Sequence, residues 1–387
     1  MRQFAFLDDD ERARLFHAEP ADVDPEGPLD QLAHALGATL YIPATRPDLA
    51  ADVVRVRGLG AGSVVLCLED AIPDGAVGEA LENVEGALAV LAGKQDLPLV
   101  FVRVRDADQV GLVTAMAAAH PRVLDGFVLP KFGVGCGPGY LDAVAAGEQR
   151  LGRRLLAMPV VETARVVHAE TRVAELVAIR ELLAGHRDRV LAVRIGATDM
   201  GSAFALRRPP DLTVYDVRLV AAAIGDVVNV LGRPEVGHAV SGPVWEYFTS
   251  ADRVLRPQLR ATPFASREDQ RLRAELMARD LDGLIREVLL DRANGLLGKT
   301  VIHPSHVPVV HAMSVVSHEE WADATEVLAA ADSGGGVVRS AYGNKMNEGT
   351  PHAAWARRLL LRASVFGVAR PDVTFVDLLS AAIGPDA

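Results

Sequence analysis

Charged side chains follow a series of short apolar segments in this chain, and several of them are carboxylates. They are Glu69 and Asp70 after VVLCL, Glu162 after MPVV, Asp199 in IGATD and Glu246 after GPVW. Carboxylate oxygens are the ligands that Mg²⁺ prefers, and a site with two of them leaves positions for water and substrate. Because Glu162 and Asp199 follow consecutive segments of the series, we predict that they bind Mg²⁺ together.

Basic side chains occur at equivalent positions, namely Arg46 after YIPAT, Arg103 and Arg105 in VFVRVRD, and Lys131 after FVLP. A guanidinium group binds a carboxylate through two parallel hydrogen bonds, so Arg46 and Arg103 suit an anionic substrate. A metal beside such arginines provides what enolate chemistry on a 2-oxo acid or an acyl thioester requires, since the metal stabilises negative charge on the enolate oxygen.

Eight short segments rich in apolar residues carry these charged side chains at their ends. The segments are Thr39–Ala44, Ser63–Glu69, Leu97–Val104, Gly126–Pro130, Leu155–Val161, Arg189–Gly196, Val236–Val244 and Leu297–His303. Longer segments with apolar residues three and four positions apart, such as Thr163–Leu183 and Thr213–Leu231, separate them and predict helices. Apolar strands that alternate with helices indicate parallel strands buried on both faces.

Eight such units in series favour a (β/α)8 TIM barrel, with a doubly wound open sheet as the alternative. The carboxyl ends of barrel strands converge on one face, so we expect the charged residues to meet there. We divide the chain into an N-terminal arm (1–38), a barrel catalytic domain (39–310) and a C-terminal helical extension or lid (311–387). The extension carries helical patterns at Ser317–Ala331 and Pro351–Phe366.

The composition is globular and argues against nucleic-acid and membrane proteins. The chain has 387 residues, 50% of them hydrophobic, and a formal net charge of −11, which does not suit binding to nucleic acid. We find neither the pattern of a signal peptide nor an uninterrupted apolar segment of roughly 18 residues, so we expect a cytoplasmic protein that does not bind membranes. The two cysteines, Cys67 and Cys136, cannot form a four-thiolate zinc site.

Lysine is rare in this chain, because only four of the 40 basic residues are lysines: Lys94, Lys131, Lys299 and Lys345. Where arginine serves as the general surface cation, a lysine in an apolar or motif-like setting is expected to need a compact ammonium group. Lys94 lies in the polar turn AGKQD and is interpreted as a solvated charge. The other three are candidates for a specific role.

The ordered set of motifs resembles the citrate lyase β-subunit-like branch of the HpcH/HpaI aldolase superfamily. The stretches that carry the resemblance are YIPATRP, VVLCLEDAIP, VFVRVRD, GFVLPKF, PVVETA, RIGATDMG, GLLGKTVIHP and GNKMNEGTPHAAWARRLL. SGPVWEYF and the NKMNE tail are similar to a divergent bacterial subgroup of carbon–carbon bond lyases from tellurium-resistance and stress gene clusters. Cys67 stands where the family usually has aspartate, and the substrate is therefore left open.

The resemblance implies a Mg²⁺-dependent barrel that performs carbon–carbon lyase or aldol/Claisen-type chemistry. It implies that Glu162 and Asp199 are the metal ligands and that Arg103 binds the substrate carboxylate. Arg46 matches a second substrate-site arginine, and we also predict that Arg105 and Glu246 bind the substrate. Glu69 and Asp70 match an acidic pair near the metal waters, and we place Lys131 with them among the catalytic residues. The general base stays open, and a metal-bound water near the acidic pair is one candidate.

The family's C-terminal segment covers the active site of a neighbouring subunit, so the resemblance implies a homo-oligomer, a homotrimer or a hexamer. Lys345 and Glu348 in GNKMNE would then approach the partner's Mg²⁺ pocket, with Lys345 binding substrate and Glu348 acting as an acid or base. The alternative is a helix-entry turn, with Asn347 or Thr350 as the cap and Pro351 in the first turn.

The function predicted from the sequence is that of a Mg²⁺-dependent carbon–carbon lyase. Its substrate would be a small 2-oxo or hydroxy acid, either free or as the CoA thioester. One alternative is a divalent-metal 2-oxo acid aldolase that acts on free acids. The other is a non-catalytic barrel that binds a ligand or serves as a scaffold in a biosynthetic complex, because a fold alone does not establish an activity.

Overall fold

The computed structural model describes residues 1–235, 237–248, 270 and 281–383. Eight parallel strands form a closed barrel in the order of the sequence. They are β2 (Ala38–Pro43), β3 (Ser63–Cys67), β4 (Leu99–Arg103), β5 (Gly126–Leu129), β6 (Leu156–Val161), β7 (Val193–Ile195), β8 (Val240–Trp245) and β9 (Leu297–Val301). The predicted TIM barrel is confirmed, and each predicted strand overlaps an observed one. The prediction for the seventh strand began at Val236, which lies outside the described residues.

The barrel closes where β2 pairs with β9, through Ala38 opposite Lys299 and Leu40 opposite Val301. The strands are buried almost throughout; all six residues of β6, for example, are buried. This pattern is expected for strands that face side chains of the barrel interior on one side and helices on the other.

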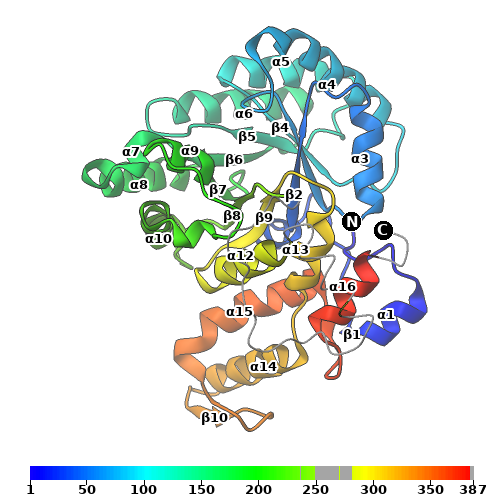
Figure 1. Ribbon diagram of the computed structural model, residues 1–387, viewed down its shortest axis with the longest axis vertical. Helices are drawn as coiled ribbons and strands as arrows, with labels where there is room; N and C mark the ends of the chain where they lie inside the picture. Colours follow the sequence, from blue (N-terminus) through cyan, green and yellow to red (C-terminus); the bar gives the residue numbers. More distant parts are fainter. Residues whose placement is uncertain (236, 249–269, 271–280, 384–387) are drawn as a thin grey trace.

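Helices follow the strands and surround the barrel (Figure 1). They are α3 (Leu49–Gly58), α4 (Val77–Leu91), α5 (Ala107–Ala117), α6 (Gly137–Leu151), α7 (Ala164–Val167), α8 (Ala169–Ala184), α9 (Ala197–Ser202), α10 (Arg218–Leu231), α12 (Leu281–Ala293) and α13 (His306–Ser314). Local signals start and orient them: the Asp106 side chain accepts a hydrogen bond from the amide of Gln109 and caps α5. Helix α10 buries Val220, Ala223, Ile224 and Val227, at the spacing of one helical face.

The N-terminal segment and the C-terminal extension contact each other outside the barrel. The first contains α1 (Asp9–Leu15), β1 (Phe16–Ala18) and α2 (Leu29–Ala35), and β1 pairs with β12 (Val368–Ala369) near the end of the chain. The extension contains α14 (His318–Asp332), the hairpin of β10 (Val337–Arg339) and β11 (Met346–Glu348), α15 (Gly349–Phe366) and α16 (Phe375–Ile383).

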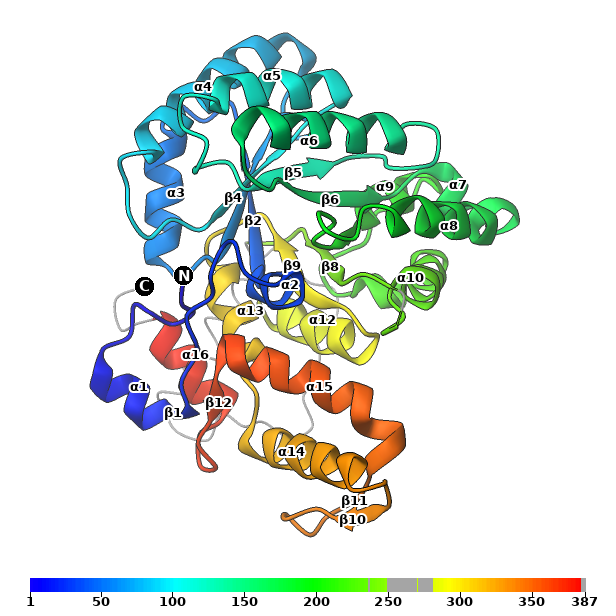
Figure 2. The ribbon, with the colours of Figure 1, turned by 180° about the vertical axis from the view of Figure 1, so that it is seen from behind.

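The extension lies at the amino ends of the barrel strands. Helix α15 packs on α2, which precedes β2, and Arg358 donates a hydrogen bond of 2.5 Å to the carbonyl of Gly295, which precedes β9. Figure 2 shows α14 and the β10–β11 hairpin extending away from the barrel on this side. Within one chain, the extension therefore does not cover the carboxyl ends of the strands. None of the helices within the described residues has the length and apolar character needed to cross a membrane.

A buried ionic network fixes β9 to α12. The Lys299 ammonium lies 2.7 Å from Glu287 Oε1 and 2.8 Å from Asp291 Oδ2, and all three residues are at most 1% exposed. Arg208 pairs with the second oxygen of Glu287, and Tyr215 donates to Asp291 over 2.7 Å. Two cations thus balance two carboxylates, which makes the burial of all four charges tolerable.

Removing one cation from this network should destabilise the fold. Lys299→Met leaves Glu287 and Asp291 short of a counter-charge, and we expect a loss of about 3–5 kcal/mol in the free energy of unfolding. The loss should be smaller at pH 5.5 than at pH 8, because the remaining buried carboxylates can take up a proton. Urea unfolding at both pH values measures it, with the exposed Lys94→Met as the matched control. Equal stability of the two variants would contradict this account.

Candidate active site

Three carboxylates from two strand ends converge on Arg103, the last residue of β4. Its Nη2 atom lies 2.8 Å from Glu69 Oε2, 3.3 Å from Asp70 Oδ2 and 3.3 Å from Glu162 Oε1. Glu69 and Asp70 follow β3, and Glu162 follows β6. The guanidinium is largely buried, with 12% of the side chain exposed. We call these four residues together with Lys131 the Arg103 cluster.

Lys131 contacts the same carboxylates through both its backbone and its side chain. Its amide donates a 2.8 Å hydrogen bond to Glu162 Oε1, and its Nζ lies 2.5 Å from Glu69 Oε1 and 3.3 Å from Asp70 Oδ1. The residue has a φ of +48°, in the left-handed region that residues other than glycine seldom occupy. Such conformations cost on the order of 1–3 kcal/mol and concentrate at functional sites.

Glu162 is packed against the loop that carries Asp199. A Cβ atom on Gly196 would lie 1.8 Å from Glu162 Oε2, so only glycine allows this approach. Burial raises the pKa of Glu162 to about 7; the charge of Arg103 opposes this rise, and the smaller effect of the nearby Asp199 adds to it. A buried carboxylate with a second one nearby is an environment in which a bound cation is favourable.

The described residues contain no gathered group of three or more His, Cys, Asp and Glu side chains of the kind that encloses a metal ion. Mg²⁺ does not require one, because it is usually held by one or two carboxylates, with waters and substrate oxygens filling the other positions. The pair Glu162 and Asp199 fits that pattern.

Glu69 and Asp70 titrate in opposite directions. Burial and the hydrogen bond with Asp70 raise the pKa of Glu69. The pKa of Asp70 is lowered: burial opposes this, but the hydrogen bond with Glu69 and the charges of Arg103 and Lys131 prevail. The surroundings thus shift the two pKa values apart, as is typical of carboxyl groups with different roles in proton transfer.

Arg105 shapes the loop that carries the acidic pair. It donates hydrogen bonds of 2.7 Å and 2.9 Å to the carbonyls of Leu68 and Ile72, and it pairs with Asp74. These contacts fix the backbone on both sides of Glu69 and Asp70. Arg105 was predicted to bind substrate; in the structure its guanidinium holds this loop.

Arg46 and Glu246 lie at strand ends but have other partners. Arg46 binds Asp52 over 2.5 Å and 3.2 Å, and its side chain is 54% exposed. Glu246 accepts a 2.8 Å hydrogen bond from Thr198, the residue before Asp199, and lies 3.6 Å from Arg208. Glu246 thus lies beside the Asp199 loop, whereas the guanidinium of Arg46 is engaged by Asp52.

Comparison with known proteins decides the family. Residues 30–368 match the carbon–carbon bond lyase family of the TIM-barrel fold (C-C_Bond_Lyase). The chain belongs to this family. The match confirms the prediction of a carbon–carbon lyase.

Solved structures share the fold of this lyase. A citrate lyase from Burkholderia xenovorans LB400 is 20% identical over 93% of this chain and 97% of that one, with a TM-score of 0.61. The protein CitE from Mycobacterium tuberculosis, in complex with magnesium, acetoacetate and coenzyme A, is 22% identical over 86% of this chain and 99% of that one, with a TM-score of 0.51. A Haloferax volcanii malate synthase in a magnesium/glyoxylate complex is 14% identical, covers 70% of this chain and 73% of that one, and has a TM-score of 0.51. No curated protein matches the chain significantly.

The tail residues of the lyase lie far from the Arg103 cluster of the same chain. Lys345 is bound to Glu319 and Asp323 of α14, 2.7 Å from each. Glu348 is exposed at the start of α15. Both belong to the end of the extension that Figure 2 shows pointing away from the barrel.

Sequence reasoning missed two residues beneath the site of the lyase. Arg194 of β7 is 1% exposed, lies over the ring of Tyr41 at 5.4 Å and contacts Thr39 at 3.4 Å. Burial raises the pKa of Tyr41, while the charges of Arg194 and Arg103 lower it. A positive charge thus lies inside the barrel on the side of the acidic cluster. The available signal was an arginine in the middle of the apolar strand LAVRIG.

The raised pKa of Glu162 predicts a stability change that needs no metal. Glu162→Gln should increase the free energy of unfolding at pH 8, in EDTA, by on the order of 3 kcal/mol, since about 1.4 kcal/mol corresponds to one pKa unit. In the unmutated lyase, Glu162 binds its proton up to about pH 7 when folded and only to about 4.5 when unfolded, so stability is lost as the pH rises through this window. The gain should therefore vanish near pH 4.5.

Urea unfolding between pH 4.5 and 8 measures this difference. Glu82→Gln, at an exposed position of α4, is the control and should change little at any pH. A Glu162→Gln gain that does not depend on pH would mean that repacking, not ionisation, separates the two proteins.

Proposed function

We propose that this lyase breaks or forms a carbon–carbon bond of a small 2-oxo or hydroxy acid, with Mg²⁺ held by Glu162 and Asp199. The observation that carries the proposal is the arrangement around Arg103. Its contacts with the three carboxylates all use Nη2, while its buried Nε has no hydrogen-bond partner in the described chain. A guanidinium with an unused donor beside a pair of carboxylates is a binding place for an anion next to a cation.

Arg103 would bind the substrate carboxylate through donors that these contacts do not use. Glu69, Asp70 and Glu162 hold the guanidinium in one orientation, so little freedom is lost when the substrate binds. Mg²⁺ bound at Glu162 and Asp199 would supply Lewis acidity toward the negative charge that develops on the substrate oxygen. Glu69, whose pKa is raised, and Asp70, whose pKa is lowered, would supply and accept protons, with the Lys131 ammonium 3.3 Å or less from both.

The ligands in the compared structures support small oxo acids as the substrate class to test. Magnesium with acetoacetate and coenzyme A in the Mycobacterium protein, and magnesium with glyoxylate in the malate synthase, combine a divalent cation with a small oxo acid. Because these proteins share only the fold at this identity, free acids and CoA thioesters both belong in the panel of substrates. Activity on free acids alone would favour the aldolase alternative.

We also propose that the active site is completed by a second copy of the chain in a homotrimer or a hexamer. The extension lies at the amino ends of its own strands, so Glu348 is out of reach of its own Arg103 cluster. Lys345 and Glu348 would then reach the strand ends of a neighbour, with Lys345 facing the substrate anion and Glu348 acting as an acid or base. The exposure of Glu348 supports this arrangement, since a carboxylate at that position is available to a partner.

The metal assignment predicts the effect of Asp199→Asn. Mg²⁺ should raise the unfolding temperature of the unmutated lyase, and this rise should disappear in Asp199→Asn while the fold persists, because the barrel forms the site without the metal. Turnover of 2-oxo acids, hydroxy acids and their CoA esters should fall at least 100-fold. The exposed Asp142→Asn on α6 is the control. Full activity of Asp199→Asn with Mg²⁺ would place the metal elsewhere, and no activity of the unmutated chain on any member of the panel would overturn the proposed function.

A mixing experiment tests the contribution of the second copy. Glu348→Gln and Asp199→Asn should each be inactive alone, and a mixture should regain activity because a hybrid oligomer contains sites with neither change. For random mixing in a trimer, the regained activity should approach about one quarter of the unmutated level. Gel filtration of differently tagged chains establishes that subunits exchange. Absence of recovery despite exchange would mean that Glu348 acts within its own chain or takes no part in the reaction.

A further inference from the structure

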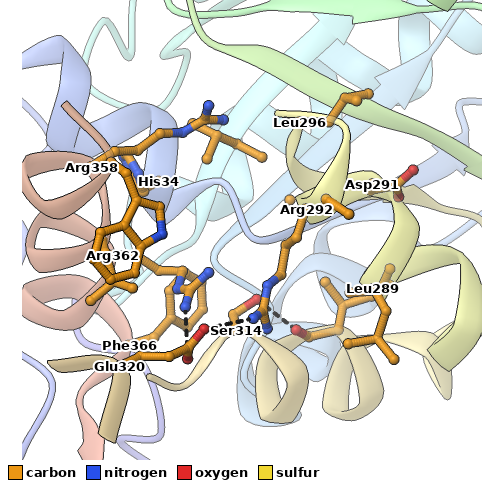
Figure 3. A pocket seen from close by; sticks show the side chains of 17 residues that line it. His34, Leu289, Asp291, Arg292, Leu296, Ser314, Glu320, Arg358, Arg362 and Phe366 are labelled. Carbon is orange, nitrogen blue, oxygen red and sulfur yellow. Dashed lines mark hydrogen bonds and ion pairs between the residues drawn. The ribbon is translucent and has the colours of Figure 1, made fainter. Parts of the chain in front are cut away.

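A cavity of about 330 Å³ lies between the barrel and the extension, at the amino end of β9 (Figure 3). This volume is at the lower end of the roughly 300–1,000 Å³ of small-molecule sites. Three arginines, one carboxylate and one histidine of its lining matter here: Arg292 of α12, Arg358 and Arg362 of α15, Glu320 of α14 and His34 of α2. It lies at the opposite end of the barrel from the Arg103 cluster.

The positive charge of this cavity exceeds its negative charge. Glu320 lies 3.4 Å from Arg292 Nη2 and 3.4 Å from Arg362 Nη2, both long contacts, and it also accepts the hydroxyl of Ser317 at the start of α14. The other carboxylate of the lining, Asp291, is bound by Lys299 in the network at β9. One shared carboxylate therefore faces three guanidinium groups.

Arg362, which lines this positively charged cavity, has a hydrogen-bond donor without an acceptor. Its side chain is 15% exposed, and its Nε is buried and has no hydrogen-bond partner in the described chain. Burial and the charge of Arg292 lower the pKa of Arg362 to about 10, against the opposing effect of Glu320. A buried donor without an acceptor is unfavourable. An anion in the cavity would balance the excess positive charge and accept a hydrogen bond from Arg362 Nε.

His34 adds an acceptor to the same cavity. Its Nδ1 lies 2.8 Å from the carbonyl of Asp30, so Nδ1 carries the hydrogen and Nε2 is left as an acceptor. Nε2 is buried and lacks a partner among the described residues, and burial lowers the pKa of His34 to about 4, which keeps the ring neutral. Figure 3 shows His34 and Arg358 on the same side of the cavity. The lining thus offers guanidinium donors and one acceptor that needs a hydroxyl or N–H.

We propose that this cavity is a binding site for a small hydroxylated dianion, such as a phosphate monoester or a hydroxy dicarboxylate. Arg292 and Arg362 bind the anionic oxygens, Arg358 contributes from the exposed rim, and His34 accepts the hydroxyl of the ligand. Two negative charges match the excess of three cations over one carboxylate. The bound ligand joins α12 of the barrel to α15 of the extension, so it stabilises the contact between them. The site does not depend on the proposed reaction.

Thermal unfolding of the full chain in EDTA tests the site with three probes: glycerol 3-phosphate, malate and inorganic phosphate, each against sodium chloride at equal ionic strength. We expect a saturable rise in the unfolding temperature with the first two, and tighter binding of glycerol 3-phosphate than of phosphate. Arg362→Met should raise the apparent dissociation constant at least tenfold, and Arg362→Lys less. The exposed Arg150→Met on α6 is the matched control.

The Arg103→Met variant separates this site from the active site and should keep the full response. Loss of the response in Arg103→Met would assign the probes to the active site and overturn the proposal, as would a response no larger than that of chloride. Equal binding of phosphate and glycerol 3-phosphate would overturn the role of His34. If Arg362→Met does not fold, Arg358→Met at the exposed rim provides the same test, and an unchanged response there overturns the site.

Discussion

The active end of the molecule depends on one buried guanidinium that holds like charges together. Glu69, Asp70 and Glu162 come from two strands on either side of β4, and their mutual repulsion would separate them without the Nη2 atom of Arg103 at 2.8–3.3 Å. The closed barrel makes this possible, because it fixes the ends of β3, β4 and β6 whatever the charges prefer. The raised pKa of Glu162 comes first from its burial; the charges of Asp199 and Glu69 add to it, and the charge of Arg103 opposes it.

The two buried clusters of charged residues in the barrel differ in how completely their charges are balanced. At β9, Lys299 and Arg208 balance Glu287 and Asp291, and each carboxylate has close partners, so this network serves the fold. Around Arg103 the balance is incomplete: one buried donor lacks a partner and one carboxyl titrates near neutrality. The cavity of Arg292 and Arg362 has the opposite imbalance, with cations in excess. A buried cluster that is not neutral and not fully bonded is the physical signature of a place for a ligand.

The sequence was sufficient to predict the barrel fold, but it was not sufficient to predict which charged side chains pair with each other. The periodicity predicted each strand of the barrel because parallel strands buried on both faces are continuously apolar, although the predicted Arg189–Gly196 is longer than the observed Val193–Ile195. The TIM-barrel fold brings the charged residues at the strand ends to one face. The predicted convergence is observed for Glu69, Asp70, Arg103, Lys131 and Glu162. The pairing of Arg46 with Asp52, the left-handed backbone of Lys131 and the clamp formed by Arg105 depend on loop geometry, which no periodicity encodes. The roles of these residues in catalysis stay predictions.

The position of the extension connects the two proposed sites. Helix α15 contains Arg358 and Arg362 and begins directly after Glu348. A ligand that fixes α15 against α12 therefore also fixes the position of Glu348. If Glu348 completes the site of a second copy, the dianion and the substrate favour the same placement of α15. Linkage is reciprocal, so each ligand must then tighten the binding of the other by the same factor. The coupling requires that α15 can take at least two placements, because ligands that meet one fixed helix cannot influence each other's binding.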